Sequence, residues 1–251
     1  MKKKIYNKIN INNMIYINHN KKAIFIHIPK TGGTYIGPTL VKYYGFISFL
    51  NLIANRRPDH DIICKTRYFK MVLTGNTTYD TSFFNKLVGL LVYCKTSDYF
   101  NEIMNMTEEK WNTYTKFCFI RNPYTRALSG WTHFDTIFNL NSTFSEYISQ
   151  NKYNITDIEY GHIFMSQKTQ IQDVDGSCGV DLIGRFENLE HDFVDILHKL
   201  GFDKILHKPK KENVSNKTGS DSYIFEKSSI QKMNTLFADD LSLFHYTQLQ
   251  V

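Results

Sequence analysis

Three short apolar runs in the chain predict buried β-strands. Residues 23–28 (AIFIHI), 116–120 (KFCFI) and 180–186 (VDLIGRF) are rich in β-branched and aromatic side chains and show little polar alternation. Such runs are typical of strands that are covered on both faces, as in a parallel sheet. Turn residues and then an amphipathic stretch follow the runs. This alternation predicts an α/β fold with a central, mostly parallel sheet flanked by helices.

Helical periodicity appears between and after these runs. Pro123 suits the first position of a helix with Asn122 as its N-cap, and Gly201 suits the position that closes one. The predicted helices cover residues 39–44, 60–73, one or two segments within 83–110, 123–140, 187–200 and 228–246. Polar stretches at 74–82 and 207–222 predict loops.

The positive charge of the chain is concentrated at its beginning. Six of the 30 Lys and Arg residues lie within residues 1–22, which contain no acid, so the remainder has 24 basic residues against 24 acidic ones. We interpret residues 1–22 as a basic Lys/Asn-rich arm, either poorly ordered or added as an edge strand, and residues 23–251 as one domain. A neutral body excludes a nucleic-acid face spread over the fold, although it permits a local anion site.

Targeting and metal signals are missing from the sequence. Asn residues interrupt every apolar run near the N-terminus, and the apolar stretch at 83–94 is too short to span a bilayer, so we expect a soluble, cytoplasmic protein without a signal peptide. The four cysteines are scattered without metal-ligand spacing. Free buried thiols and no metal are the expectation.

A turn rich in glycine follows the first predicted strand. Residues 29–34 read Pro-Lys-Thr-Gly-Gly-Thr and lead toward a helix. Glycines let backbone amides approach an anion, and a helix N-terminus adds a favourable dipole. The order of residues is not that of a Walker A loop, and a plain strand-to-helix turn is the alternative. Pro38 follows closely, so either the helix begins near Pro38 or its first turn is irregular.

A second anion motif follows the next strand. Arg121 stands at the carboxyl end of that strand, where parallel sheets bind ligands, and its guanidinium matches phosphate oxygens. Ser129 lies about two turns into the helix that follows. The alternative is an ordinary ion pair at Arg121 and a helix surface position at Ser129.

Taken together, the two motifs resemble the sulfotransferase superfamily. HIPKTGGT (27–34) and FIRNPYTRALSGW (119–131) are most similar to its carbohydrate branch, the heparan sulfate 2-O- and chondroitin 4-O-type enzymes and their bacterial relatives. VDLIGRFENLEHDF (180–193) and FADDLSLFHY (237–246) extend the likeness over residues 23–246, with weak stretches at 75–110 and 140–175. The resemblance implies a P-loop-like three-layer fold.

The resemblance also implies transfer of a sulfuryl group from 3′-phosphoadenosine-5′-phosphosulfate (PAPS) to a hydroxyl, with 3′-phosphoadenosine-5′-phosphate (PAP) as product and no metal. By this likeness Arg121 and Ser129 hold the 3′-phosphate, and Lys217 in the late loop is a further donor-binding candidate. The residues that the likeness assigns to the 5′-phosphosulfate are Lys30, Thr31, Gly32, Gly33 and Thr34. Lys30 also neutralises charge on the leaving oxygen.

The general base is assigned to His60 by the same resemblance, because relatives carry their proposed catalytic histidine in the interval between the two motifs. His162, Asp59 and Asp61 are the alternatives, whereas His27 on the first strand is expected to be a packed histidine.

The expected acceptor is a glycan or glycosylated molecule. A peptide tyrosine or a lipid hydroxyl is the alternative acceptor, and a nucleotide- or glycan-binding pseudoenzyme is the alternative function. Arg126 and Glu187 are expected to anchor the fold rather than to contact the donor.

Overall fold

A five-stranded sheet forms the centre of the computed structural model, which describes residues 15–48, 105–138, 140, 142–149, 164–172, 177–209 and 225–251. The order of the strands across the sheet is β3-β1-β2-β4-β5. Their bounds are Ile15–Asn18 (β1), Ala23–Ile26 (β2), Ile47–Ser48 (β3), Thr115–Ile120 (β4) and Leu182–Arg185 (β5).

The sheet is mostly parallel. β4 pairs in parallel with β2 on one side and β5 on the other, with Phe25 opposite Phe117 and Phe119 opposite Gly184. β1 is antiparallel to both β2 and β3, so four of the five strands run in one direction. The three strands predicted from apolar runs are therefore present, and the α/β prediction is confirmed.

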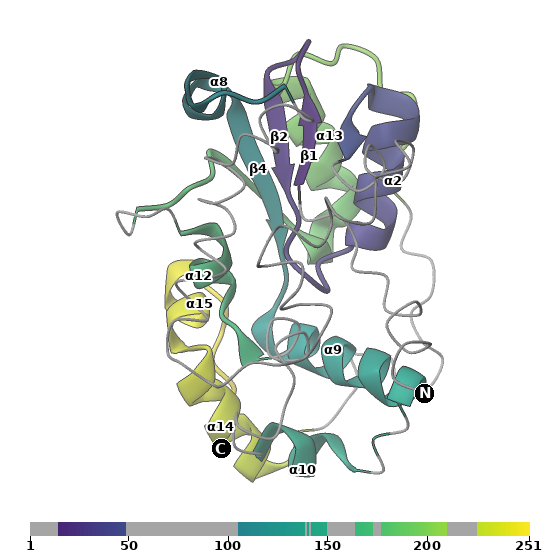
Figure 1. Cartoon of the computed structure of the whole chain (residues 1–251). Helices are drawn as coiled ribbons and strands as arrows, with labels where there is room; N and C mark the ends of the chain where they lie inside the picture. The colour runs from purple at the N-terminus through teal and green to yellow at the C-terminus, as the bar shows by residue number, and fades with distance from the viewer. Residues whose placement is uncertain are drawn as a thin grey trace, which may run out of the picture.

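Helices cover both faces of this sheet (Figure 1). α2 and α13 lie on one face, while α8, α12 and α15 lie on the opposite side. The bounds of the described helices are Gly33–Tyr44 (α2), Glu108–Thr113 (α8), Pro123–Phe138 (α9), Phe144–Ser149 (α10), Gln167–Ile171 (α12), Leu189–Lys199 (α13), Lys227–Leu236 (α14) and Ala238–Leu243 (α15), with a short 3-10 turn at Phe186–Asn188.

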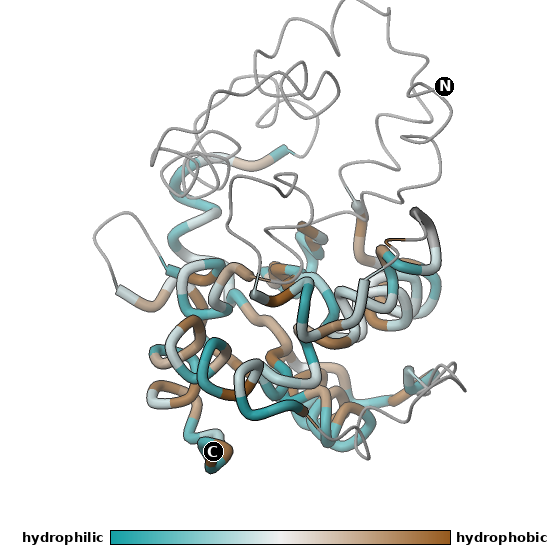
Figure 2. Tube along the Cα trace, turned by 90° about the horizontal axis from the view of Figure 1, so that it is seen from below, coloured by the Kyte–Doolittle hydropathy of each residue, from teal (hydrophilic) through white to brown (hydrophobic). Residues whose placement is uncertain are grey.

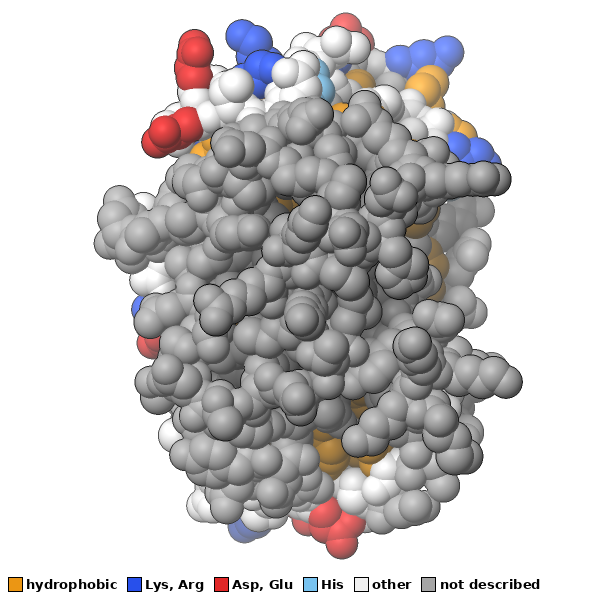
Figure 3. Space-filling model, in the orientation of Figure 1, with side chains coloured by type: hydrophobic (Ala, Val, Ile, Leu, Met, Phe, Trp, Pro, Cys, Tyr) orange, Lys and Arg blue, Asp and Glu red, His pale blue; other side chains and the backbone are white. Residues whose placement is uncertain are grey.

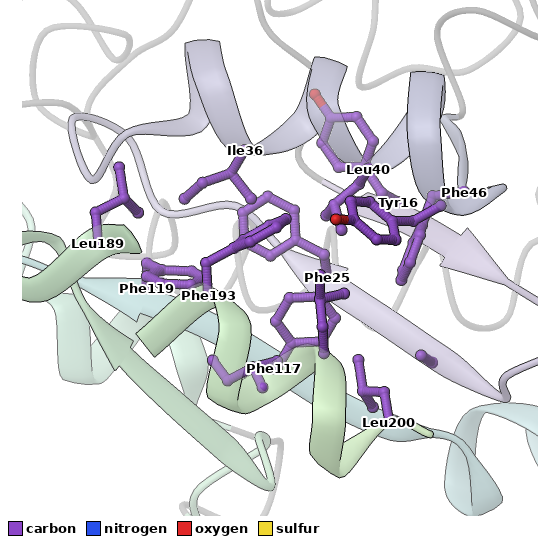
Figure 4. Packing of buried hydrophobic residues seen from close by; sticks show 14 residues of the cluster. Tyr16, Phe25, Ile36, Leu40, Phe46, Phe117, Phe119, Leu189, Phe193 and Leu200 are labelled. Carbon is purple, nitrogen blue, oxygen red and sulfur yellow. The ribbon is translucent and has the colours of Figure 1, made fainter. Parts of the chain in front are cut away.

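An aromatic core joins the sheet to α2 and α13. The rings of Phe25 and Phe117 stack with centroids 5.2 Å apart, and Phe193 approaches Phe119 at 6.5 Å. Ile36 and other apolar residues of α2 point into the same cluster from above (Figure 4). These rings and branched side chains bury large apolar areas. Their packing therefore stabilises α2 against the sheet.

A second core lies below the sheet, where α9, α10, α14 and α15 meet. Tyr124, Leu128 and Phe134 of α9 are buried there against Met233 and Phe237. Along these helices hydrophobic and hydrophilic segments alternate (Figure 2), as expected for helices with one buried stripe. This core holds α9 against the carboxyl end of β4.

The beginning of the chain differs from the sequence-based expectation. Ile15–Asn18 is an interior strand between β3 and β2, so a poorly ordered arm or an edge strand is wrong for these four residues. Ile15 and Ile17 pack on one face of the sheet and Tyr16 on the other. The Lys and Asn residues around this short run obscured a strand that is buried on both faces.

α2 also differs from expectation at Pro38. The helix begins at Gly33 rather than near Pro38, and the amides of Tyr35 and Ile36 both donate to the Gly32 carbonyl at 2.9 and 3.0 Å. Pro38 removes only the N–H that would bond the Thr34 carbonyl, and both residues are exposed, so water can hydrate that carbonyl.

The C-terminal region forms two helices instead of the single one predicted over 228–246. α14 ends at Leu236, and the buried Phe237 (φ −112°, ψ 19°) separates it from α15. The break directs Phe237 into the second core and turns the buried Asp240 toward α12. Tertiary contacts therefore override a continuous helical period.

Candidate anion-binding site

The two sequence motifs meet at one edge of the sheet. Because β2 and β4 are parallel neighbours, the loop after Ile26 and the turn after Ile120 leave the sheet side by side. α2 starts from the first of these connections and α9 from the second (Figure 1). This edge, at the carboxyl ends of adjacent strands, is where open α/β sheets bind ligands.

The loop after β2 takes a shape that only glycine permits at two positions. Gly32 has φ 91°, and a Cβ on Gly33 would lie 1.8 Å from Nε2 of His27. His27 is thus a packed histidine beneath the loop, as expected. The Thr31 hydroxyl donates to the Ile28 carbonyl at 2.7 Å and is fully buried, so it ties the loop together. The first N–H groups of a helix have no acceptor within the helix, so the start of α2 offers backbone donors next to this loop.

Lys30 and Arg121 come together at this edge. Nη1 of Arg121 donates to the main-chain carbonyl of Lys30 at 3.3 Å, and its Nε donates to Oγ1 of Thr125 at 3.1 Å. The guanidinium carbon also lies 4.3 Å from the ring centroid of Phe186. Arg121 is 7% exposed, so three neighbours fix a buried cation next to the glycine-rich loop.

The electrostatics of this pair favour an anion. Burial lowers the pKa of Lys30 from 10.5 to about 8, and the positive charge of Arg121 adds to the lowering. The hydrogen bonds of Arg121 to Lys30 and Thr125 end on uncharged oxygens. Two like charges held close in a buried site repel, and a phosphate or sulfate group between them would relieve that repulsion.

Charged side chains elsewhere on the described surface are arranged differently. Figure 3 shows acidic and basic side chains together at the upper end of the molecule, around α8, at the amino end of β4. Glu108 and Glu109 of α8 are exposed there. Mixed solvated charges need no ligand, unlike the buried charge of Arg121 at the opposite end of the strand.

One face of α9 carries three polar side chains, of which Thr125 contacts Arg121. Thr125, Ser129 and His133 are four residues apart, so they share one face of the helix. Asn122 caps this helix, as predicted, because its Oδ1 accepts from the amide of Tyr124 at 3.0 Å. Burial and, secondly, the charge of Lys30 lower the pKa of His133 from 6.5 to about 4.

The backbone of Arg121 is clamped by residues that the sequence motifs did not reveal. The buried Gln167 accepts from the Arg121 amide at 2.8 Å and donates to its carbonyl at 2.7 Å. Asp240 in turn accepts from the amides of Gln167 and Lys168, both at 2.8 Å. No local signal could find this clamp, since its members lie in separate segments of the chain.

Arg126 and Glu187 anchor the site from outside, as expected. The fully buried Arg126 donates to the Met165 carbonyl, and the charge of Asp240 partly offsets the burial that lowers its pKa to about 10. Glu187 accepts from the Asn122 amide at 2.7 Å and from the Tyr246 hydroxyl at 3.0 Å. Both residues fix the connection from β4 to α9.

Some of the expected site residues lie outside the described residues. These are His60, Asp59, Asp61, His162 and Lys217. Of those that are described, Gly32 and Gly33 are buried, Lys30 and Ser129 are half-buried, and Thr34 is exposed. Within the described ranges no group of three or more His, Cys, Asp or Glu residues could hold a metal ion. No described helix is long and apolar enough to cross a membrane.

Fold and site define an α/β protein in which the buried Arg121 and the half-buried Lys30 follow adjacent parallel strands, an arrangement suited to anionic groups. In a comparison with protein families, the Sulfotransferase family matches residues 13–247 of the chain. The chain therefore belongs to the sulfotransferase family, and the resemblance of its two motifs is confirmed. No curated protein and no solved structure matches the chain. The matched range includes β1, which precedes the part recognised from the motifs.

Proposed function

We propose that this sulfotransferase moves a sulfuryl group from PAPS to a hydroxyl of a carbohydrate acceptor. The observation that supports the donor best is the contact between the buried Arg121 and the backbone carbonyl of the half-buried Lys30, which joins the segments after two adjacent strands. A nucleotide with anionic groups at both its 3′ and 5′ positions would satisfy two neighbouring cations at once.

The residues of the two motifs divide between the ends of this donor. The 5′-phosphosulfate is assigned to Lys30, the start of α2, Thr31 and the hydroxyl of Thr34. For Thr31 the amide is the better donor, because its hydroxyl is already bonded to Ile28. Arg121 and Ser129 are assigned to the 3′-phosphate, and Lys217 is a further contact. The amides at Gly32 and Gly33 add uncharged donors.

The reaction is an in-line displacement at sulfur. The acceptor oxygen forms the new S–O bond while the bond from sulfur to the bridging phosphate oxygen breaks, and PAP leaves. Lys30 neutralises the charge that develops on the bridging oxygen. His60 takes the proton of the acceptor hydroxyl, with His162, Asp59 or Asp61 as its substitutes. No metal takes part in this scheme.

Calorimetric titration with PAP, beside 5′-AMP and ATP with Mg²⁺, tests the donor. We expect tight binding of PAP alone, because only PAP carries both the 3′- and the 5′-phosphate. Binding of all three nucleotides with equal affinity, or of none by folded protein, would overturn the donor assignment. The second outcome would favour a pseudoenzyme.

Arg121→Ala supplies the matching variant. It should weaken PAP binding by about 1.5–3 kcal/mol, the scale of a charged hydrogen bond, and leave 5′-AMP binding nearly unchanged. Lys116→Ala is the control, because Lys116 lies at the opposite, amino end of β4 and its Nζ donates to the carbonyls of Trp111 and Tyr114 at 3.1 and 3.0 Å. An equal loss of affinity for PAP and 5′-AMP would contradict the assignment of the 3′-phosphate to Arg121.

Labelled PAPS then identifies the acceptor class. Transfer to an oligosaccharide, and not to a tyrosine peptide or a lipid, is the expected result. Transfer to the tyrosine peptide or to the lipid would leave PAPS as the donor but would contradict the carbohydrate acceptor.

A further inference from the structure

Phe186 lies level with Arg121 across the parallel pair of strands that ends at the site. In the register of β4 and β5, Ile120 is opposite Arg185, so the next residue of each segment, Arg121 and Phe186, leaves the sheet beside the other. The guanidinium carbon of Arg121 lies over the Phe186 ring, 4.3 Å from its centroid. Strand pairing thus places the charge of Arg121 against an aromatic face.

The same ring also contacts the glycine-rich loop. A Cβ placed on Gly32 would lie 3.1 Å from Cδ2 and 3.3 Å from Cε2 of Phe186, so the ring closes directly against the backbone of Gly32. Phe186 is half-buried and packs on the aromatic core that α2 and α13 share. One side chain therefore contacts both the loop that follows β2 and the arginine that follows β4.

The backbone beside the ring is tied to the start of α9. Glu187, the next residue, accepts a hydrogen bond from the Asn122 amide at 2.7 Å and another from the Tyr246 hydroxyl at 3.0 Å. Two consecutive residues, Phe186 and Glu187, thus contact two consecutive residues, Arg121 and Asn122. This double contact keeps the ring in place relative to the guanidinium.

A fixed guanidinium is what recognition of a phosphate requires. Two parallel N–H groups of an arginine must meet two phosphate oxygens, so affinity depends on the orientation of the guanidinium plane. An arginine side chain that is free to rotate must lose that freedom on binding, which weakens affinity. Attraction between a cation and an aromatic face is strongest where water is excluded, and Arg121 is buried.

We propose that Phe186 is a positioning residue that sets the preference of the donor site for a 3′-phosphate, because its ring holds the guanidinium of Arg121 in the orientation that binds this group. The assignment rests on the proposed PAPS donor. It adds a residue from a third segment of the chain, outside both anion motifs. Phe186 acts through Arg121 and not on the nucleotide.

The ratio of PAP affinity to 5′-AMP affinity tests the proposal, because the two nucleotides differ only in the 3′-phosphate. Phe186→Leu keeps an apolar side chain and removes the ring. We expect PAP affinity to fall about tenfold, the scale of a partly desolvated cation–π contact, and 5′-AMP affinity to stay within about twofold of wild type. Phe186→Tyr, which keeps the ring, should recover most of the PAP affinity.

A double variant separates action through Arg121 from direct contact with the nucleotide. If the ring acts through Arg121, Phe186→Leu should weaken PAP binding no further in protein that already carries Arg121→Ala. Thermal unfolding of each variant reports whether the fold is intact. If Phe186→Leu does not fold, Phe186→Met, which also lacks a ring, takes its place.

Phe202→Leu is the matched control. Phe202 is also half-buried, packs on the same aromatic core and lies under a cation, with Nζ of Lys21 5.0 Å from its ring centroid. Lys21 precedes β2, so this pair lies at the amino end of that strand, whereas the candidate site lies at its carboxyl end. The affinities for PAP and 5′-AMP should both stay unchanged in this variant.

Four results would overturn the proposal. One is an equal loss of PAP and 5′-AMP affinity in folded Phe186→Leu, which would mean that the ring serves a part of the site that both nucleotides use. The others are unchanged PAP affinity in Phe186→Leu, a folded Phe186→Tyr that binds PAP as weakly as Phe186→Leu, and additive losses in the double variant. Failure of the wild-type protein to bind PAP is a distinct outcome, because it removes the proposed donor and this assignment with it.

Discussion

Lys30 has an unfavourable backbone conformation, and its charged side chain lies in an unfavourable environment. Its φ is 70°, in the left-handed region that non-glycine residues rarely adopt, and burial with the neighbouring Arg121 lowers its pKa to about 8. Strain and desolvation of this kind collect at binding sites, where a ligand compensates them.

Anion binding should therefore depend on pH near 8. A bound phosphate raises the pKa of Lys30 again, so the complex keeps a proton that the free protein loses. PAP affinity should be constant below pH 8 and fall by up to about tenfold per unit above it. Calorimetry from pH 7 to 9.5 measures this dependence. In Lys30→Met the profile should be flat, and a flat wild-type profile would contradict the role of Lys30.

Removing the charge should also stabilise the fold. The folded-state pKa of Lys30 is below the 10.5 of the unfolded chain, so the protonated side chain opposes folding fully below pH 8 and no longer above 10.5. Lys30→Met should gain about 1–3 kcal/mol at pH 7 by denaturant unfolding, with the gain shrinking toward pH 10. A loss of stability at pH 7 would show that Lys30 is not a buried, destabilising charge.

Gly33 tests the contact beneath the loop. In Gly33→Ala the new Cβ would meet the His27 ring, so the loop or the ring must shift, at a cost of about 1–3 kcal/mol and with weakened PAP binding. Gly45→Ala is the control: φ 68° strains alanine there, but its Cβ has no contact closer than 3.6 Å and lies at the far end of α2. The control should lose stability without losing affinity. Measuring both quantities for each variant separates the two effects.

At the level of elements, the orientation of α9 depends on the buried carboxylate of Asp240. It caps α12 and faces the buried Arg126 of α9. Asp240→Asn should cost about 3–5 kcal/mol in urea unfolding, because the buried Arg126 would lose the favourable charge of Asp240. Asp239→Asn, which breaks only an exposed 3.1 Å ion pair with Lys168, should cost less than about 1 kcal/mol. Equal costs for the two variants would refute this account.

Sequence reasoning found the elements whose signals are local. The runs before Pro29 and Pro123 end at residues that cannot continue a strand, so β2, β4 and the start of α9 were predictable. The residues of β1 were expected in a poorly ordered arm or an edge strand, because Lys and Asn surround its four buried residues. The break at Phe237 was missed, since it depends on which core that side chain enters.

The residues of the candidate site were likewise predictable only where a local sequence signal marks them. Lys30 and Arg121 stand at strand ends, so parallel pairing alone brings them together. Gln167 and Asp240 were not predictable, because no periodicity indicates that α12 and α15 reach the backbone of Arg121.

For the whole molecule, a ligand at this edge should act as a cross-link. The site joins the loop after β2, the start of α9 and, through Gln167, the C-terminal helices. PAP at about 100 times its Kd should stabilise the fold by about 2.7 kcal/mol and raise the Tm by roughly 5–10 °C. Differential scanning fluorimetry tests this, with Arg121→Ala as the variant that should lose most of the shift. No shift at saturating PAP would contradict it.

The clamp on Arg121 has a consequence for synthesis. Ribosomes make Lys30 first, Arg121 next, and Gln167 and Asp240 much later, and contacts between distant segments form slowly. A growing chain that already contains Lys30 and Arg121 still lacks Gln167 and Asp240, which hold the backbone of Arg121 in place. Nucleotide recognition should therefore arise only when α15 has left the ribosome, so that partly made chains do not compete with finished enzyme for the donor.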